Sequence, residues 1–434
     1  MRMLVPFLGC IADDITGATD LGSALVRRGL STVQIFGVPN PDDAAGDEDA
    51  VVVAVKTRTL PSPAAREQAL RSLRWLQSQN IAHVYFKYCS TFDSTSAGNI
   101  GPVTDELLTA LDSSQVIHCP AYPTNGRTLY QGHLFVGRSL LSESGMQDHP
   151  LTPMRDPNLV RVLGAQTPAA VDLLPLQTLQ AGPEATGRLL EELARRGVRH
   201  IIADAIADAH VDRIAAAAAG MTLLGGGAPL GAAWGAVLAR AVGGVEPAPP
   251  SLPGGPAAVL VGSASRATAR QVEKFARHWP VRRLVSTEEL SARPDLIDAV
   301  LDWARVHLAD GPILITADTR PESVGRAQTA LGRDVAAAVV EQAMGRLAAG
   351  LAGMGVGRLV VAGGETSGAV AEALGIRRVR IGPEICTGVP WTVSTDPDVA
   401  LAFKSGNFGG VDFFREALAC SPTSAPTDTD GGAR

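Results

Sequence analysis

The chain has 434 residues, more than the roughly 250–300 at which a single hydrophobic core usually splits, so we expect two domains. Hydrophobic residues make up 46% of it and charged residues 19%, which is a globular balance and excludes a disordered chain. The net charge of −6 gives no electrostatic reason to expect a nucleic-acid partner. The five cysteines are scattered, and no secretion signal or run of ~18 apolar residues is visible, so we expect a cytoplasmic protein with no membrane partner.

Short β-branched runs alternate along the chain with longer Ala-, Leu- and Arg-rich stretches of helical period. This alternation predicts an α/β fold in which each of two domains has a mostly parallel sheet flanked by helices. In the first half we expect strands at 51–55, 83–87, 115–119 and 200–203. The helices expected there span 18–28, 64–78, 103–111 and 184–196.

The clearest boundary is the segment 243–256, which holds five prolines and four glycines in fourteen residues. Such a composition sustains neither a helix nor a central strand. We therefore predict a linker at 243–256 between domains at 1–242 and 257–420, followed by a disordered tail at 421–434. In the second domain we expect strands at 257–261, 313–316, 358–361 and 379–381.

Two adjacent carboxylates, Asp13 and Asp14, follow the first apolar run, and Thr16 and Gly17 then open a helix. Open α/β sheets bind their ligands at this end of their strands. One interpretation is a plain turn with a helix cap. The other is a functional group, since an aspartate can accept a proton from a sugar hydroxyl during phosphoryl transfer. Spacing alone leaves both interpretations open.

A second polar segment follows the strand expected at 83–87. Hydroxyl-bearing and acidic side chains gather between positions 88 and 96, behind Lys87, and Gly-Asn-Ile-Gly follows at 98–101. Such a loop has the hydrogen-bonding groups to hold a polyol carboxylate, although a solvated loop has the same composition. Beyond the next strand, Arg127 is either a bidentate clamp for a carboxylate or a surface arginine in a Pro/Gly turn.

In the second half, three strands run into small-residue turns at 262–265, 363–368 and 404–409. Glycine lets a backbone approach a phosphate closely, and the N-terminus of the next helix attracts it. The three turns together predict a nucleotide phosphate site, against the alternative that glycines merely end strands. A Walker A motif, a Gly-x-Gly-x-x-Gly motif after the first strand and a His-Glu-x-x-His motif are all missing, which disfavours a P-loop ATPase, a Rossmann dehydrogenase and a zincin.

The motifs at 12–18, 89–101, 363–368 and 404–409 resemble those of the four-carbon acid sugar kinase family, in the same order, over about residues 4–420. The resemblance implies an N-terminal domain that binds the sugar acid and a C-terminal domain that binds ATP. It implies phosphorylation of the terminal C4 hydroxyl of a four-carbon acid such as threonate, erythronate or 3-oxo-tetronate. We expect ATP and Mg²⁺ as cofactors, with the ion bridging the phosphates.

Within the family, the segments 89–95 and 149–154 are more similar to 3-oxo-tetronate 4-kinases, whereas Phe92 and residues 94–97 depart from the threonate kinase pattern. The resemblance therefore favours 3-oxo-tetronate, with a threonate or erythronate 4-kinase as the alternative. A sugar-acid aldolase or dehydratase, and a ligand-binding sensor, are rivals from other classes. Whether the chain is a monomer or a homodimer, and which residues hold the metal, stay open.

The candidate site residues fall into three groups. The proposed catalytic carboxylate is Asp14 or Asp13. The candidates for binding the sugar acid are Lys87, Ser90, Thr91, Asp93, Ser94 and Arg127. The candidates for binding ATP are Ser263, Ser265, Gly363, Gly364, Glu365, Thr366 and Gly406.

Overall fold

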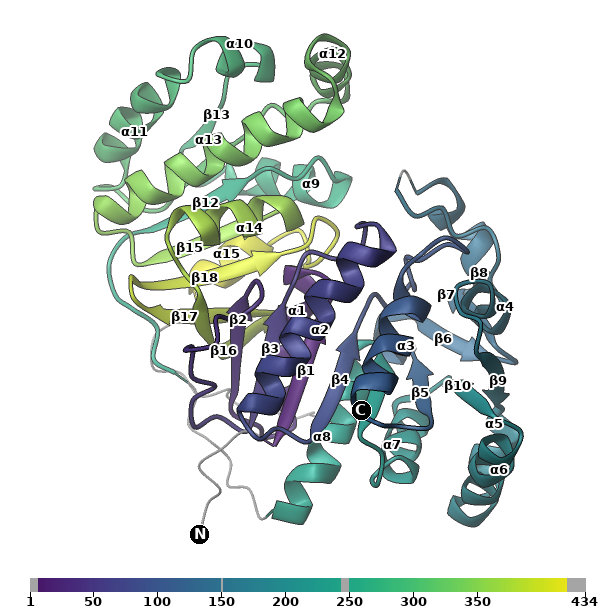
Figure 1. Ribbon diagram of the computed structural model, residues 1–434. Helices are drawn as coiled ribbons and strands as arrows, with labels where there is room; N and C mark the ends of the chain where they lie inside the picture. Colours follow the sequence, from purple (N-terminus) through teal and green to yellow (C-terminus); the bar gives the residue numbers. More distant parts are fainter. Residues whose placement is uncertain (1–6, 150, 243–249, 420–434) are drawn as a thin grey trace, which may run out of the picture. The chain divides into compact units, whose positions relative to one another are not determined.

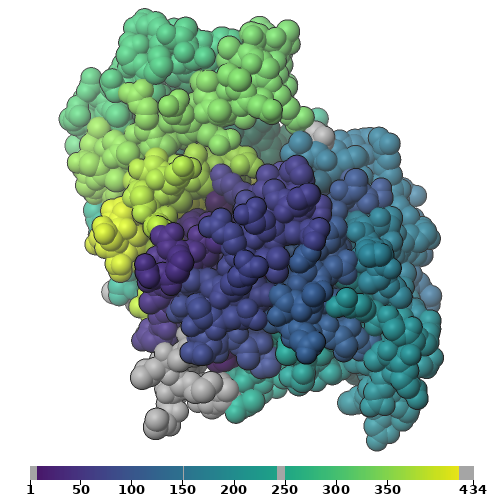
Figure 2. Space-filling model, viewed as in Figure 1, coloured from purple at the N-terminus to yellow at the C-terminus, as the bar shows by residue number. Residues whose placement is uncertain are grey.

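The computed structural model describes residues 7–149, 151–242 and 250–419 (Figure 1). The chain divides into two compact units, Met1–Ala248 and Pro249–Arg434, which Figure 2 draws in purple to teal and in green to yellow. The expected tail at 421–434 and the first half of the expected linker, 243–249, lie outside the described residues. The rest of that linker, 250–256, belongs to the second unit, where Leu252 is buried in the core.

The first unit alternates strands and helices, as its sequence pattern predicts. Its strands are β1 (Leu8–Ala12), β2 (Thr32–Phe36), β3 (Ala50–Ala54), β4 (His83–Lys87), β5 (Val116–Cys119), β6 (Arg127–Tyr130), β7 (His133–Val136), β8 (Ser139–Leu140), β9 (Ala170–Leu174), β10 (Val198–Ala203) and β11 (Leu223–Gly226). Its helices are α1 (Ile15–Arg27), α2 (Ser62–Ser78), α3 (Ile100–Ala110), α4 (Leu159–Gly164), α5 (Leu176–Gln180), α6 (Pro183–Arg195), α7 (Asp208–Ala217) and α8 (Ala228–Val242), with short 3₁₀ turns η1 (Pro123–Asn125), η2 (Leu141–Glu143) and η3 (Met146–Asp148).

The sheet of the first unit has the strand order β2-β3-β1-β4-β11-β5-β10-β9, and every described pair in it is parallel. The α1 crossover leads from β1 towards the β2 edge, whereas the α2 and α3 crossovers lead towards the opposite edge. Because such crossovers are right-handed, α1 lies on one face and α2 and α3 lie together on the other (Figure 1). Strands β6, β7 and β8 form a separate antiparallel sheet.

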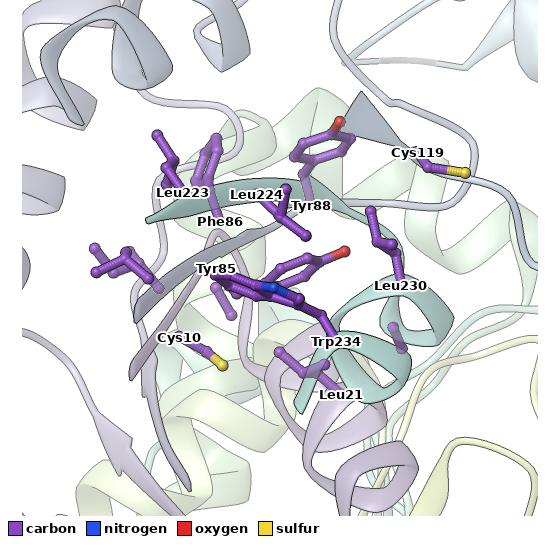
Figure 3. Packing of buried hydrophobic residues seen from close by; sticks show 14 of the residues in the cluster. Cys10, Leu21, Tyr85, Phe86, Tyr88, Cys119, Leu223, Leu224, Leu230 and Trp234 are labelled. Atoms are coloured by element: carbon purple, nitrogen blue, oxygen red, sulfur yellow. The ribbon is translucent and has the colours of Figure 1, made fainter. Parts of the chain in front are cut away.

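Close helix packing fills the core of this unit (Figure 3). Trp234 of α8 is fully buried beside Tyr85, and its indole N–H donates to the carbonyl of Ala218 over 3.1 Å. A Cβ atom at Gly231 would stand only 2.7 Å from Leu21 of α1 and 2.8 Å from the Tyr85 ring, so a glycine lets α8 approach both. This packing holds the ends of the central strands in place.

The second unit has the same layered construction. Its strands are β12 (Ala257–Val261), β13 (Val281–Arg283), β14 (Ile313–Thr316), β15 (Arg358–Ala362), β16 (Arg378–Cys386), β17 (Val389–Thr395) and β18 (Asp398–Lys404). Its helices are α9 (Arg266–Phe275), α10 (Thr287–Ala292), α11 (Leu296–His307), α12 (Pro321–Leu331), α13 (Arg333–Gly353), α14 (Gly364–Ala373) and α15 (Phe413–Ala419).

Its sheet runs in the order β13-β14-β12-β15-β18-β17-β16, parallel as far as β18 and antiparallel from β18 to β16. Helix α13 is the one helix of the described residues long and apolar enough to cross a membrane. It packs against α11, α12 and α14 instead, which is the environment of a helix in a folded domain. The prediction of two α/β domains with mostly parallel sheets is thus confirmed. The strand expected at 379–381 lies within β16, whereas the sequence did not predict β17 and β18.

Candidate active site

Three neighbouring strands of the first unit end at the same edge of the sheet. In the parallel registers, Ala12 of β1 stands beside Ala54 of β3 and beside Lys87 of β4. The chain runs from β3 to β4, on opposite sides of β1, so β1 marks the topological switch point where open α/β sheets bind ligands. The segments that follow these strands supply the residues described next.

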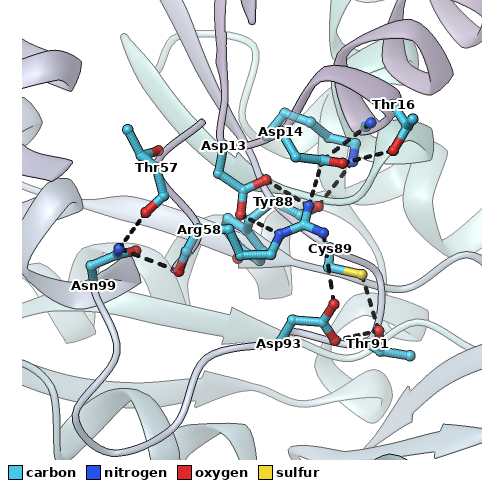
Figure 4. A network of polar contacts seen from close by, with 12 residues as sticks. Asp13, Asp14, Thr16, Thr57, Arg58, Tyr88, Cys89, Thr91, Asp93 and Asn99 are labelled. Atoms are coloured by element: carbon cyan, nitrogen blue, oxygen red, sulfur yellow. Dashed lines mark hydrogen bonds and ion pairs between the residues drawn. The ribbon is translucent and has the colours of Figure 1, made fainter. Parts of the chain in front are cut away.

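Asp13 and Asp14 share one guanidinium, that of Arg58 (Figure 4). Arg58 Nε and Nη2 donate to the two carboxylate oxygens of Asp13 over 2.9 and 2.7 Å, a bidentate geometry. Nη2 also donates to Asp14 Oδ1 over 2.5 Å. Arg58 follows β3 and lies 45 residues away from Asp13, so only the sheet brings the three groups together.

The two aspartates nevertheless differ in environment. Asp13 is buried, whereas the Asp14 side chain keeps 25% of its surface exposed. Asp14 caps α1: it accepts from the backbone N–H of Gly17 over 3.1 Å and from the Thr16 hydroxyl over 2.7 Å. The predicted helix cap and the predicted carboxylate at the sheet edge are therefore the same residue.

Their pKa values are shifted in opposite directions. Burial raises the pKa of Asp13, although Arg58 opposes the shift. Burial acts on Asp14 in the same sense, but the charges of Arg58 and Lys87 outweigh it and hold the pKa of Asp14 below its usual value. Two carboxyl groups whose pKa values are shifted in opposite directions can take different roles in a reaction. Asp14 is the more exposed of the two and the one held firmly as a carboxylate.

Lys87 is the last residue of β4, and its side chain is buried near the N-terminus of α1. Its Nζ donates to the carbonyl of Tyr88 over 3.0 Å. A Cβ at Gly17 would lie 3.1 Å from this Nζ and 2.2 Å from Asp14 Oδ1, so only glycine leaves room there for both side chains. Lys87 thus supplies a second positive charge to the cluster.

The segment after Lys87 folds into a tight loop that returns to Arg58. Phe92 and Asp93 have φ angles of 66° and 45°, in the left-handed region that L residues rarely adopt. This turn places Asp93 Oδ2 3.7 Å from Arg58 Nη1, while its Oδ1 accepts from the Thr91 hydroxyl over 2.6 Å. Backbone strain of this kind occurs at functional sites.

Other predicted residues of the loop have supporting positions. Ser94 Oγ accepts from Gln166 Nε2 over 3.0 Å, which ties the loop to the end of α4. Ser90 is partly exposed in the same loop. Asn99 Nδ2 donates to the carbonyls of Thr57 and Leu60 over 2.7 and 3.1 Å and so holds the segment that carries Arg58.

Arg127 opens β6, just after the loop that follows β5. Its Nη1 donates to the carbonyl of Asn125 over 2.6 Å. Its Nε is one of the buried side-chain nitrogens that find no hydrogen-bond partner within the described residues. An arginine donor left over in this way can bind a carboxylate.

In the second unit, the three small-residue turns predicted from the sequence come together. Gly363 N donates to the carbonyl of Lys404 over 2.9 Å, and Ser263 N to that of Ala362 over 3.1 Å. The Ser265 hydroxyl donates to the carbonyl of Gly406 over 2.5 Å. A Cβ at Gly406 would meet Ser263 Oγ at 2.5 Å, so the turns touch.

Helix α14 begins inside this cluster of turns. Gly363, with φ of 131°, precedes it, and its first turn holds the exposed residues Gly364 and Glu365 and the buried Thr366. A Cβ at Gly364 would meet nothing within 4 Å, so the space before the helix is open. Free backbone N–H groups and the helix dipole favour a phosphate there.

Lys404 lies beneath these turns with its side chain fully buried. Its Nζ donates to Thr268 Oγ1 over 3.1 Å and to the carbonyls of Ser405 and Gly406 over 3.0 Å each. Burial lowers the pKa of this amine to about 8. The three hydrogen bonds fix the turn and bring a positive charge to the predicted phosphate site.

Sequence reasoning missed Arg58 and did not single out Lys404. Arg58 stands in the short polar run at 56–59, which has no glycine and no acidic residue, so its pattern resembles that of a surface turn. For Lys404 a signal existed, because a lysine that ends an otherwise apolar strand is buried unless it is at the sheet edge.

No group of three or more histidine, cysteine, aspartate or glutamate side chains that could hold a metal ion occurs among residues 7–149, 151–242 and 250–419. A protein cage for a cation is therefore not built into the part of the chain that the structure describes. The exposed carboxylate of Glu365 stands in the first turn of α14, beside the predicted phosphate site. A Mg²⁺ ion that arrives on a nucleotide is bound mainly by phosphates, water and one or two carboxylates, so this residue fits such an ion.

Two family models match the chain. One, described as a sugar-binding N-terminal domain, matches residues 8–234, and one described as a nucleotide-binding C-terminal domain matches residues 258–414. A 3-oxo-tetronate kinase of Cupriavidus necator is 48% identical to this chain, with 95% of this chain and 96% of that protein covered. A 3-oxo-tetronate kinase of Pseudomonas fluorescens is 49% identical, with the same coverage of 95% and 96%.

Solved structures show the same fold. A protein of Salmonella typhimurium LT2 matches with a TM-score of 0.85 and 41% identity over 95% of this chain and 98% of that one. A protein of Haemophilus influenzae matches with a TM-score of 0.79 and 40% identity, covering 94% and 99% of the two chains.

Proposed function

The chain belongs to the four-carbon acid sugar kinase family, and we propose that it transfers the γ-phosphoryl group of ATP to the C4 hydroxyl of 3-oxo-tetronate. The observation that carries this proposal is the similarity, 48% and 49% identity over 95% of the chain, to proteins that are 3-oxo-tetronate kinases. Its product is 3-oxo-tetronate 4-phosphate. A metabolic kinase of this kind is expected to work in the cytoplasm.

The sugar acid binds, in this proposal, at the edge of the first unit's sheet. Asp14 accepts a hydrogen bond from the C4 hydroxyl and takes up its proton as the new bond to phosphorus forms. Asp13 holds Arg58, and Arg58 in turn holds Asp14 and Asp93 in place. Phosphoryl transfer depends mainly on positioning and electrostatics, so no covalent nucleophile is needed.

The carboxylate of the substrate needs a cation of its own. The cluster holds three carboxylates, Asp13, Asp14 and Asp93, against two cations, Arg58 and Lys87, so its formal charge is negative. A substrate carboxylate placed there would be repelled. We therefore assign the carboxylate to Arg127, whose Nε lacks a partner in the described part of the chain, and the hydroxyls to the loop with Ser90, Thr91 and Ser94.

ATP binds, in this proposal, in the second unit, with its phosphates on the turn from Gly363 to Thr366. Backbone N–H groups at the start of α14 and the buried charge of Lys404 stabilise the phosphate charge. Ser263, Ser265 and Gly406 form the wall of this site. Glu365, exposed in the first turn of α14, is the protein group that would hold Mg²⁺, which neutralises phosphate charge when bound.

A substrate panel tests the proposal. ADP release from ATP is measured with 3-oxo-tetronate, threonate, erythronate and acetate, the last as a carboxylate without hydroxyls. We expect the highest kcat/KM with 3-oxo-tetronate and none with acetate. A preference for threonate or erythronate would reassign the substrate within the family, and chemical change of the acid without ADP release would point to an aldolase or dehydratase.

A further inference from the structure

A row of buried polar side chains crosses the core of the first unit, and none of them has a role in the site described above. Tyr88 Oη lies 3.0 Å from His118 Nδ1, His118 Nε2 lies 3.1 Å from His200 Nδ1, and His200 Nε2 lies 2.9 Å from Asp105 Oδ1. Tyr88, His118 and His200 are fully buried. Asp105, on α3, keeps 23% of its side chain exposed and also accepts from the Thr167 hydroxyl over 2.6 Å.

The carboxylate at one end sets the direction of every hydrogen bond in the row. Burial would raise the pKa of Asp105, but hydrogen bonds from His200 and Thr167 lower it, so this group is an ionised acceptor. With both imidazoles neutral, His200 donates from Nε2 and accepts at Nδ1. His118 donates to that atom from its own Nε2, and its Nδ1 accepts the Tyr88 hydroxyl proton.

The neutral state of His118 agrees with this direction. Burial lowers the pKa of His118 well below its usual value. A neutral imidazole carries one donor and one acceptor, which is what the row requires. The His118 and His200 rings are nearly parallel, with centroids 5.4 Å apart and an angle of 15° between their planes.

At its other end the row reaches the loop that carries Asp93. The Tyr88 ring packs edge-on against the Phe92 ring, with centroids 5.5 Å apart. Phe92 and Asp93 are the two residues in the left-handed conformation, and Asp93 contacts Arg58. Local hydrogen bonds close this turn, from Phe92 N to the carbonyl of Cys89 over 3.0 Å and from Asp93 N to that of Thr91 over 2.8 Å. The contact with the Tyr88 ring adds support from outside the turn.

We propose, on the basis of the proposed function, that His118 and His200 are positioning residues of the sugar-acid site. They lock Tyr88 through its hydroxyl, and Tyr88 holds the 89–93 loop so that Asp93 and Arg58 face the substrate. Asp105 is the anchor that selects the tautomers. Gly225 makes the row sterically feasible, since a Cβ there would stand 3.2 Å from His118 Nδ1 and 3.3 Å from the Tyr88 ring.

The tautomers can be observed without any activity. Two-bond ¹H–¹⁵N correlation spectra of the ¹⁵N-histidine-labelled full chain at pH 7.5 distinguish the Nε2–H from the Nδ1–H form, and single variants assign the signals. We expect both His118 and His200 to carry the proton on Nε2. An Nδ1–H form, or a charged ring, at either position would overturn the proposal.

Kinetics test the positioning role. Loss of a buried hydrogen bond is worth roughly one factor of ten. Tyr88→Phe keeps the ring but removes the hydroxyl, so we expect KM for 3-oxo-tetronate to rise about tenfold, while KM for ATP stays unchanged. Asp105→Ala should behave in the same way. Asp105→Asn should restore near-normal KM, because its amide oxygen still accepts from His200 Nε2.

Thr104→Val is the matched control. Thr104 is fully buried on α3, next to Asp105, but its hydroxyl donates to the carbonyl of Ile100, outside the row. The Thr104→Val substitution should leave KM for 3-oxo-tetronate and KM for ATP unchanged. If Tyr88→Phe and Asp105→Ala lower kcat while both KM values stay at the wild-type level, the row only supports folding and the proposal fails.

The test separates this inference from the proposed function. If the unmodified chain releases no ADP with any acid, the proposed function fails. The positioning role is then read from the Kd for 3-oxo-tetronate, measured by calorimetry on the same variants. A Kd unchanged by Tyr88→Phe and Asp105→Ala would overturn the inference by itself.

Discussion

Two neighbouring aspartates with one shared arginine show how the environment separates chemically identical side chains. Asp13 is buried in a bidentate pair with Arg58, whereas Asp14 is partly exposed, caps α1 and has a lowered pKa. An aspartate whose lone pairs are occupied by a buried arginine has little left for a substrate. At the residue scale, Asp14 is therefore the better candidate for the group that meets the C4 hydroxyl.

Asp14→Asn should lower kcat by about a hundredfold or more, since asparagine cannot accept the proton. The fold should survive, because asparagine caps a helix as well as aspartate does. Turnover is measured by coupled ADP release, and folding by circular dichroism. The matched control is Asp172→Asn, which breaks an exposed ion pair with Arg196 and should leave kcat unchanged. Near-normal turnover of a folded Asp14→Asn variant would remove this role.

We predict that Lys404 makes nucleotide binding depend on pH. Burial lowers its pKa from the ordinary 10.5 to about 8, so the folded protein loses this charge at lower pH than the unfolded chain does. The KM for ATP should therefore rise as pH increases through about 8. The same shift makes the folded state more stable as pH rises from 8 to 10.5, because the unfolded chain still binds the proton there.

Lys404→Met should raise KM for ATP at pH 7 and abolish its further rise between pH 7 and pH 9.5. Lys274→Met, on α9, is the control, because Lys274 contacts Asp412 near the surface and should keep the wild-type pH profile. A KM for ATP that rises above pH 8 in the Lys404 variant as it does in the wild type would assign the titration to another group.

At the element scale, the start of α14 differs in steric tolerance from one glycine to the next. Gly363 has φ of 131° and touches Thr366, so a side chain there strains the backbone. Gly364 is exposed with open space around its Cβ position. Glycine at position 363 is therefore required by the backbone conformation, whereas glycine at position 364 is required only to leave room for the ligand.

Gly364→Val should fold normally and raise KM for ATP more than KM for 3-oxo-tetronate, because the new side chain occupies the space that the phosphates need. Steady-state kinetics with each substrate varied in turn give the two values. Gly187→Val in α6 is the control, since its Cβ position is also open but lies in the first unit. A larger effect on the sugar-acid KM would move the nucleotide to another place.

At the scale of the whole molecule, we propose that the sugar acid binds to the first unit and ATP to the second. Each unit has its own hydrophobic core and its own sheet. A ligand that binds only the native form of a unit stabilises that unit. The assignment of the sugar acid to one unit and of ATP to the other can therefore be tested by measuring which backbone amides each ligand protects from hydrogen exchange.

Hydrogen exchange measured by mass spectrometry should show this division. ATP should slow exchange in the turns at 262–265, 363–366 and 404–406. 3-Oxo-tetronate should slow exchange at 13–17 and in the 87–95 loop. Acetate is the control and should protect neither set. Protection of the first unit's segments by ATP alone would reverse the assignment of the two ligands.

Local patterns in the sequence were sufficient for some of the strands and helices, mainly strands of the two parallel sheets. The apolar runs at 83–87, 257–261 and 313–316 coincide with β4, β12 and β14, since a buried parallel strand shows as a short β-branched run. β11, Leu223–Gly226, escapes the pattern because two of its four residues are glycines. β17 and β18 were also missed; β17 pairs antiparallel with β16 and β18, whereas β18 pairs in parallel with β15 on its other side.

The sequence by itself determined the α/β class, the order of the motifs and, through them, the family, because each motif is a run of neighbours along the chain. Only the tertiary structure placed Arg58 between Asp13, Asp14 and Asp93 and aligned the buried histidines, because contacts between strand ends depend on strand order, which composition and spacing do not encode.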